Sequence, residues 1–202
     1  MCTMRMFVGC KTLFTIYLFL TIVTQQENMT IAAAASKAGL ELATFGAGCF
    51  WGTEKFFSKQ FGSNLKSFAV GYMGGPSKAT YKDVCTGTTN HAEVLQVSYE
   101  PTQLAYSDLV HFFFRMHDPT TLNRQGNDRG TQYRSVIFTH TKEQQKIAEQ
   151  VRDEVQASGK IKGQIVTQIE PVGDLQFFMA EPYHQRYLEN QPDGYCNHKL
   201  YY

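Results

Sequence analysis

Alternating apolar and polar positions predict strands in several parts of the chain. Between 93 and 99, Leu95, Val97 and Tyr99 fall on one face by period two, and Glu93 has the same parity. The alternation turns the Glu93 carboxyl group toward the apolar interior, whereas a twist or bulge at the strand end would return it to solvent. Further strands are expected over 40–45, 66–72, 133–139, 164–170 and 175–180.

Apolar residues spaced three and four apart predict three helices, over 49–61, 109–116 and 141–158. The first follows the turn Gly46-Ala47-Gly48, and the second ends before Pro119. Thr141 with Gln144 has the pattern of a capping box, and Gly159 suits the left-handed residue that stops a helix. Helices and strands interleave with few parallel crossover units, which predicts a mixed two-layer α/β sandwich.

Residues 1–38 differ from the rest of the chain. Their apolar run, Leu13 to Val23, is shorter than the roughly 20 residues that a membrane span needs, so no stable membrane anchor is expected. The run is typical of a secretory signal peptide, and a mitochondrial presequence ranks second. Alternatively, Met29 is the working start and the protein is cytosolic. Residues 39–202 are expected to form one domain.

Composition and charge narrow the function classes. The chain has 19 Lys and Arg against 18 Asp and Glu, so it offers no basic surface for nucleic acid. It has no glycine-rich nucleotide motif, and its six histidines show no ligand-spaced pair, so we expect no metal site. Its cysteines are odd in number and scattered, which favours reactive or buried thiols over a disulfide scaffold: Cys2, Cys10, Cys49, Cys85 and Cys196.

Cys49 stands where a predicted strand turns through glycines into a helix. Unpaired backbone N–H groups and the helix dipole should stabilise its thiolate and lower its pKa below about 8.5. Phe50 and Trp51, the only tryptophan, add aromatic surface suited to a methyl or thioether group. The alternative is a small cysteine and a tryptophan that simply pack in the core.

Glu93 is the candidate acid of such a site. Burial would raise the pKa of its carboxyl group, and a carboxylic acid that is neutral near pH 7 can protonate a developing oxyanion. The polar loop 125–133 has the form of an ordinary turn or of the rim of an active site.

The segment Gly48-Cys49-Phe50-Trp51-Gly52 resembles the signature of the A-type peptide methionine sulfoxide reductases. The resemblance extends over about residues 40 to 196, in the family's order. It is carried further by Gly71–Gly75 (G-Y-x-G-G), Thr80–Cys85 (T-Y-x-x-V-C), His91-Ala92-Glu93, His117-Asp118-Pro119, Arg124–Asp128, Gly130–Ser135, His184-Gln185 and Gly194-Tyr195-Cys196.

This resemblance implies an enzyme that reduces the S epimer of methionine sulfoxide, free or in proteins, without a bound cofactor. It implies that Cys49 attacks the sulfoxide sulfur and that Glu93 protonates the leaving oxygen. Tyr81 and Tyr133 would hold that oxygen, and Asp128 would position the polar network around it. Phe50 and Trp51 would hold the substrate methyl group.

Attack leaves a sulfenic acid on Cys49, which a second thiol converts into a disulfide that thioredoxin reduces. The matching motif makes Cys196 that second thiol. Many family members carry another recycling cysteine beyond a glycine-rich run, but this chain ends Asn197-His198-Lys199-Leu200-Tyr201-Tyr202. A cycle of two thiols is therefore expected, with Cys85 as a structural cysteine beside Tyr81.

The family's fold is a two-layer α/β sandwich with a ferredoxin-like core and long coiled terminal segments, and a monomer is expected. The segment 189–202 should be an irregular surface tail. A cycle coupled to thioredoxin suits the cytoplasm or mitochondria, whereas the signal-like segment points to the secretory pathway.

Two other functions compete with this interpretation. In a cysteine hydrolase, Cys49 would be activated by His91, His117 or His184 and would form an acyl intermediate. In a non-enzymatic interaction module, the surface of Phe50 and Trp51 would only bind apolar side chains.

Overall fold

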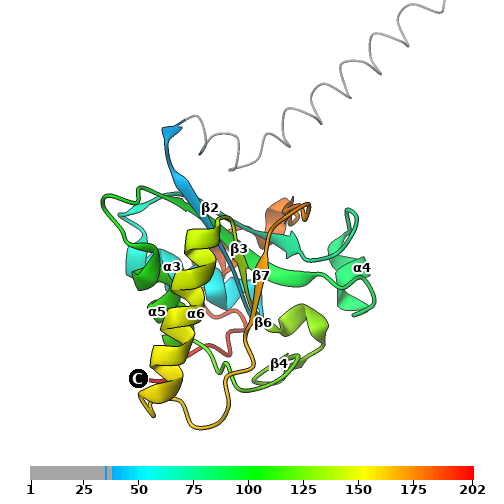
Figure 1. The fold of residues 1–202 in the computed structure, drawn as a ribbon. Coiled ribbons are helices and arrows are strands. Elements are labelled where there is room, and N and C mark those ends of the chain that lie inside the picture. The colour runs from blue at the N-terminus through cyan, green and yellow to red at the C-terminus, as the bar shows by residue number, and fades with distance from the viewer. Residues whose placement is uncertain (1–34, 36–37) are drawn as a thin grey trace, which may run out of the picture.

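The protein is built on one mixed sheet, shown by a computed structural model that describes residues 35 and 38–202 (Figure 1). The predicted targeting segment lies outside these residues. Six strands have the order β7-β6-β1-β3-β2-β8, and only β6 and β7 pair in parallel. Their bounds are β1 Glu41–Ala47, β2 Leu65–Met73, β3 Ala92–Tyr99, β6 Ser135–Thr139, β7 Gln168–Pro171 and β8 Phe178–Met179. A separate small hairpin consists of β4 Arg124–Gln125 and β5 Asp128–Arg129.

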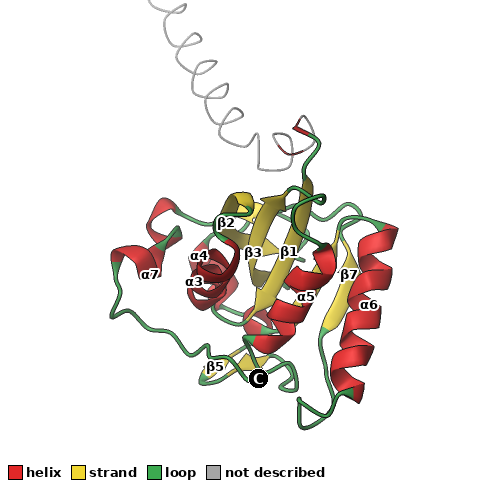
Figure 2. Ribbon diagram, turned by 90° about the vertical axis from the view of Figure 1, so that its left-hand side faces the viewer, coloured by secondary structure: helices red, strands yellow, loops and turns green. Residues whose placement is uncertain are grey.

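Three helices pack on one face of the sheet, α3 Phe50–Phe61, α5 Tyr106–Arg115 and α6 Lys142–Ala157 (Figure 2). The shorter elements are α4 Tyr81–Cys85, α7 Tyr187–Asn190 and the 3₁₀ turns η1 Thr131–Tyr133 and η2 Pro182–His184. The described part of the chain contains no helix with the length and apolar character needed to cross a membrane. The mixed sheet and the helices packed on it confirm the predicted α/β class.

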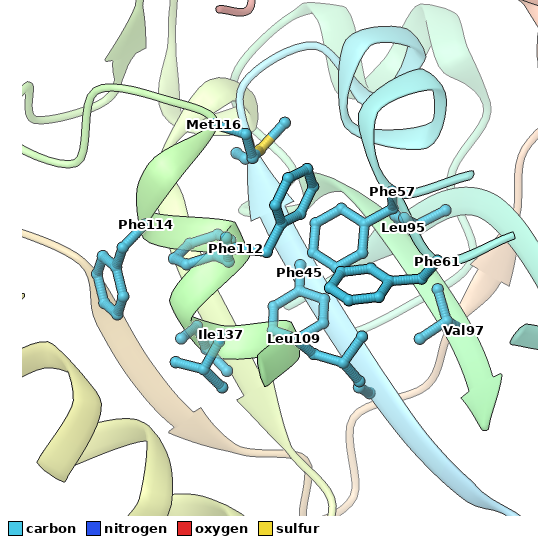
Figure 3. Packing of buried hydrophobic residues seen from close by; sticks show 14 of the residues in the cluster. Phe45, Phe57, Phe61, Leu95, Val97, Leu109, Phe112, Phe114, Met116 and Ile137 are labelled. Carbon is cyan, nitrogen blue, oxygen red and sulfur yellow. The ribbon is translucent and has the colours of Figure 1, made fainter. Parts of the chain in front are cut away.

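Aromatic residues fill the space between the sheet and these helices (Figure 3). The ring of Phe45 on β1 lies 5.0 Å from that of Phe57 on α3 and 5.4 Å from that of Phe113 on α5. A second apolar cluster on the opposite face includes Val94, with Leu175 packed against it. Strand β3 is therefore buried on both faces, and all its eight residues are inaccessible.

The C-terminal half departs from the expected elements in two ways. Tyr133 belongs to the turn η1 and not to the strand, which begins at Ser135. The strands expected over 164–170 and 175–180 shrink to β7 and β8, because each pairs over only a few residues. The sheet partners available, and not the local sequence, set the lengths of these strands.

Helix α4 is an element that the apolar pattern did not predict. The Thr80 hydroxyl accepts a hydrogen bond from the Asp83 N–H, and the Asp83 carboxylate accepts one from the Thr80 N–H. This capping box satisfies the first donors of a helix that is too short to show a periodic apolar face. The spacing of Thr80 and Asp83 was the available signal.

The last residues form an irregular segment, as expected, but they do not lie wholly at the surface. The segment runs from α7 past β5 to the C-terminus (Figure 2). His198 is buried, and its Nε2 lies 2.7 Å from the carbonyl oxygen of Ala47. Its ring packs on Gly52, where a Cβ atom would lie 2.0 Å from Nδ1. The Tyr201 N–H donates to the carbonyl oxygen of Arg115.

Substitution of a buried and of an exposed leucine should change the free energy of unfolding by very different amounts. Leu109 on α5 is 0% exposed and Leu122 is 67% exposed. Leu109→Ala should lower the free energy of unfolding by about 2–5 kcal/mol, because it removes buried contacts and leaves a cavity. Leu122→Ala should change it by less than about 0.5 kcal/mol. Urea unfolding of the two variants measures both values, and equal losses would contradict this description of the core.

Candidate active site

Cys49 occupies the position just before the first turn of α3. Strand β1 ends at Ala47, and Gly48, with φ of 94°, turns the chain into the helix. A Cβ atom on Gly48 would lie 2.5 Å from the Cβ of Gln125, so both conformation and space require glycine there. The Cys49 side chain is only 8% exposed. The predicted order of strand, glycine turn and helix is confirmed.

Glu93 is buried, as its parity on β3 predicted, and it lies next to this turn. Glu93 is 2% exposed, and Oε2 of its carboxyl group accepts a hydrogen bond of 3.0 Å from the backbone N–H of Phe50. Burial raises the pKa of Glu93 to about 8, the Phe50 N–H opposes this rise, and the charge of Asp128 adds to it. Glu93 is therefore mostly protonated at neutral pH, which is the state a general acid needs.

The pKa of Cys49 differs from the expectation drawn from the helix start. Burial raises the pKa of the thiol above its ordinary value, and the charge of Glu93 raises it further. The N–H groups of Trp51 and Gly52 favour the thiolate but do not outweigh these effects. The prediction of a lowered pKa was wrong because it counted the helix dipole and omitted desolvation. The charge of Asp128 also raises the pKa of Cys49, and protonation of Glu93 removes one of these three unfavourable causes.

Tyr81 and Tyr133 approach the same region from α4 and η1. Burial raises the pKa of each hydroxyl, and Glu93 contributes to the rise in both cases. Both phenols therefore stay protonated and can donate hydrogen bonds. The Tyr81 N–H donates to Oε1 of Glu181 over 2.9 Å, and this carboxylate also accepts from the Tyr72 hydroxyl over 2.8 Å. Glu181 thus holds the start of α4 against β2.

Asp128, on β5, directs its carboxylate oxygens to the C-terminal segment. Oδ1 lies 3.1 Å from the hydroxyl of Tyr195, and Oδ2 lies 2.8 Å from Nδ2 of Asn197. Burial raises the pKa of Asp128, against the effect of these two donors. Its charge acts on both Cys49 and Glu93, and its hydrogen bonds connect the surroundings of these two residues to the tail.

An aromatic cluster borders Cys49 on the side of α7. The Trp51 indole stacks on Tyr187, with ring centres 3.9 Å apart, and its Nε1 donates to Nδ1 of His184 over 3.1 Å. The His184 ring also lies 5.1 Å from Phe50 and 4.5 Å from Tyr81. Phe50 and Trp51 are therefore together, as predicted.

Two members of this neighbourhood, Tyr187 and Glu181, were not predicted from the sequence. Tyr187 begins the four-residue helix α7 and Glu181 lies just before η2, so neither stands in an element long enough to show periodicity. Their nearness to the motif His184-Gln185 was the one available signal.

The histidines considered as bases have other partners. His117 is buried, its ring nitrogens lie 2.7 Å from the carbonyl oxygen of Phe113 and 2.8 Å from the hydroxyl of Ser135, and burial lowers its pKa to about 3. His184 accepts from Trp51, and the His91 ring packs against Phe178. Among the described residues, no histidine forms a hydrogen bond to the Cys49 thiol, which the hydrolase hypothesis requires.

Three thiols lie within the described chain, and all are free: Cys49, Cys85 and Cys196. Cys196 is partly buried between Tyr195 and Asn197, the two residues that bind Asp128. Cys85 is exposed and lies beside the Tyr81 hydroxyl, one turn away on α4. The residues that the model describes contain no cluster of three or more His, Cys, Asp or Glu that could hold a metal ion.

The sequence is similar to those of known proteins. The family model described as peptide methionine sulfoxide reductase matches residues 41–201. The peptide methionine sulfoxide reductase MsrA of Methanothermobacter thermautotrophicus is 54% identical over 77% of this chain and 90% of its own. A probable peptide methionine sulfoxide reductase of Schizosaccharomyces pombe is 49% identical over 77% of this chain and 92% of its own.

Solved structures agree with the sequence comparison. The reduced form of Mxr1 from Saccharomyces cerevisiae is 44% identical, covers 80% of this chain and 92% of its own, and gives a TM-score of 0.74. Mxr1 in complex with Trx2 covers 80% of this chain and 89% of its own, with 31% identity and a TM-score of 0.54. The chain belongs to the peptide methionine sulfoxide reductase family.

Proposed function

We propose that the protein reduces the S epimer of methionine sulfoxide, free or in proteins, to methionine, with thioredoxin as the final reductant. The observation that carries this proposal is the buried, protonated Glu93 beside the buried Cys49 thiol. Cys49 supplies the electrons and Glu93 supplies a proton, and sulfoxide reduction requires both. The names of the relatives and the Mxr1–Trx2 complex support the substrate and the reductant.

In the first step, the Cys49 thiolate attacks the sulfoxide sulfur, and the sulfoxide oxygen takes the proton of Glu93. The S–O bond breaks as the oxygen is transferred to the cysteine sulfur. Methionine leaves, and Cys49 becomes a sulfenic acid, so the cysteine sulfur supplies the two electrons. The thiol proton of Cys49 goes to water when the thiolate forms, and the sulfenic hydroxyl keeps the proton that Glu93 gave.

The groups around Cys49 suit the two ends of a methyl sulfoxide. We assign the hydroxyls of Tyr81 and Tyr133 to the developing negative charge on the oxygen, because both stay protonated and lie in the field of Glu93. The faces of Phe50 and Trp51 suit the methyl group. A site with a polar side and an apolar side accepts one arrangement of oxygen and methyl at a chiral sulfur, which favours one epimer.

A second thiol completes the cycle. We assign this role to Cys196, because its neighbours bind Asp128 and the tail packs on the helix that Cys49 begins. Its thiolate displaces hydroxide from the Cys49 sulfur, and the hydroxide leaves as water. Thioredoxin then reduces the Cys49–Cys196 disulfide. Exposed Cys85 stays outside this cycle.

Single-turnover reduction of the separated sulfoxide epimers by the full chain tests the function. Without added reductant, the S epimer should give up to one methionine per enzyme, with the loss of two thiols. Cys49→Ser should give none, because the nucleophile is absent, and Cys85→Ser should behave like the unmodified chain. Mass spectrometry counts the thiols. Methionine from neither epimer would refute the proposed function.

The pH dependence of that single turnover tests the pairing of Cys49 with Glu93. In the productive form, Cys49 is a thiolate and the Glu93 carboxyl group is protonated, so these two groups together hold one proton. Below the Glu93 pKa of about 8, the rate should rise with pH as the thiolate fraction grows. Above it, the gain in thiolate is offset by the loss of protonated Glu93, and the rate should level off.

Glu93→Gln is the matched variant for the pH experiment. It should be slower by about a hundredfold or more, because the proton donor is lost. Its rate should continue to rise through pH 8, because only the thiol still titrates. Stopped reactions between pH 6 and 10 measure both profiles, and a plateau that persists in Glu93→Gln would refute Glu93 as the acid.

If Cys196 is the second thiol, its loss should leave the first turnover intact and impair the later turnovers that need thioredoxin. Cys196→Ser should form one methionine per enzyme at the normal rate, because the first step needs only Cys49. Its turnover with thioredoxin should fall by roughly a hundredfold or more, since no disulfide forms for thioredoxin to reduce. Methionine formation with and without thioredoxin measures the two quantities. Full turnover in Cys196→Ser would move the second thiol elsewhere, and Cys85→Ser would identify it.

A further inference from the structure

The residues on either side of Cys196 bind the same carboxylate. The Asn197 amide nitrogen lies 2.8 Å from Oδ2 of Asp128, 2.8 Å from the carbonyl oxygen of Gln125 and 3.2 Å from the Tyr195 hydroxyl. Tyr195 in turn donates to Oδ1 of Asp128. Asn197 is therefore the centre of a network that joins the tail to the hairpin β4–β5, next to the Cys49 turn.

A second anchor follows one residue later. His198 contacts the carbonyl oxygen of Ala47 and packs on Gly52, so it touches the chain both before and after Cys49. The hairpin is close to the same place, because Gln125 packs against Gly48. The two anchors confine the backbone of Cys196 to the neighbourhood of Cys49 while its thiol remains free.

We propose that Asn197 is a positioning residue for the resolving step, in which the Cys196 thiolate attacks the Cys49 sulfenic acid. This inference rests on the proposed function. The S–S bond forms as the S–O bond of the sulfenic acid breaks. Water leaves, the Cys49 sulfur is reduced and the Cys196 sulfur is oxidised. Asn197 touches neither sulfur, and it acts by holding the adjacent backbone.

Anchoring the tail should speed the resolving step because it raises the effective concentration of the Cys196 thiol at the Cys49 sulfur. A tail that is held in place presents Cys196 to the sulfenic acid repeatedly, whereas a released tail samples a much larger volume. The bond to Asp128 is charge-assisted, which makes it stronger than a bond between neutral groups. The alternative is that these bonds only stabilise the fold.

The test follows the two steps separately in the full chain after mixing with the S sulfoxide without reductant. In Asn197→Ala, methionine should form at the normal rate. Disulfide formation should slow by about tenfold, as expected for the loss of a charge-assisted bond. A dimedone quench followed by mass spectrometry should trap correspondingly more Cys49 sulfenic acid. A role in the fold alone would not extend the lifetime of this intermediate.

Matched variants separate the possible outcomes. Asn190→Ala, at an exposed position of α7, should leave both steps unchanged, and Cys196→Ser should give the maximal amount of trapped sulfenic acid. Normal disulfide formation in Asn197→Ala would overturn this inference and leave the proposed function intact. Slower methionine formation in Asn197→Ala would also overturn it, because Asn197 would then act on the first step. Failure of the unmodified chain to form methionine would refute the proposed function itself.

Discussion

The hydrogen bond from the Phe50 N–H to the Glu93 carboxyl group determines how the site is assembled. The first N–H groups of a helix need acceptors, and Cys49, at the capping position of α3, provides no side-chain hydrogen bond. A carboxyl group from the middle of the sheet provides one instead. This bond joins α3 to β3 and places the thiol beside the acid. Because both faces of β3 are covered, the acid is also kept from water.

This burial decides the protonation states of the site. Desolvation raises the pKa values of both Cys49 and Glu93, and each negative charge would disfavour the other. The free enzyme at neutral pH therefore contains a thiol and a carboxylic acid, a neutral pair. A thiol that remains protonated is a poor nucleophile toward unrelated oxidants and electrophiles. The thiolate is favoured while Glu93 keeps its proton, and its attack is productive only where a sulfoxide oxygen can accept that proton, so reactivity is coupled to the substrate.

The sequence predicted those parts of the protein whose positions depend on local rules. Period two turned Glu93 inward, and the glycine turn placed Cys49 at the start of a helix. The pKa of Cys49 could not be obtained in this way, because desolvation depends on neighbours from several elements. Glu181 and Tyr187 were missed for a related reason, since tertiary contacts alone bring their irregular segments to the site. The buried position of His198 likewise depends on Gly52, more than a hundred residues earlier in the chain.

Asp128 shows why assigning one role to each residue is too simple for this site. The family motif gives it to the polar network around the substrate oxygen, and its charge does act on Cys49 and Glu93. Its hydrogen bonds, however, go to the tail that carries Cys196. In the proposed mechanism, one carboxylate therefore contributes to the electrostatics of the first step and to the anchoring of the thiol for the second.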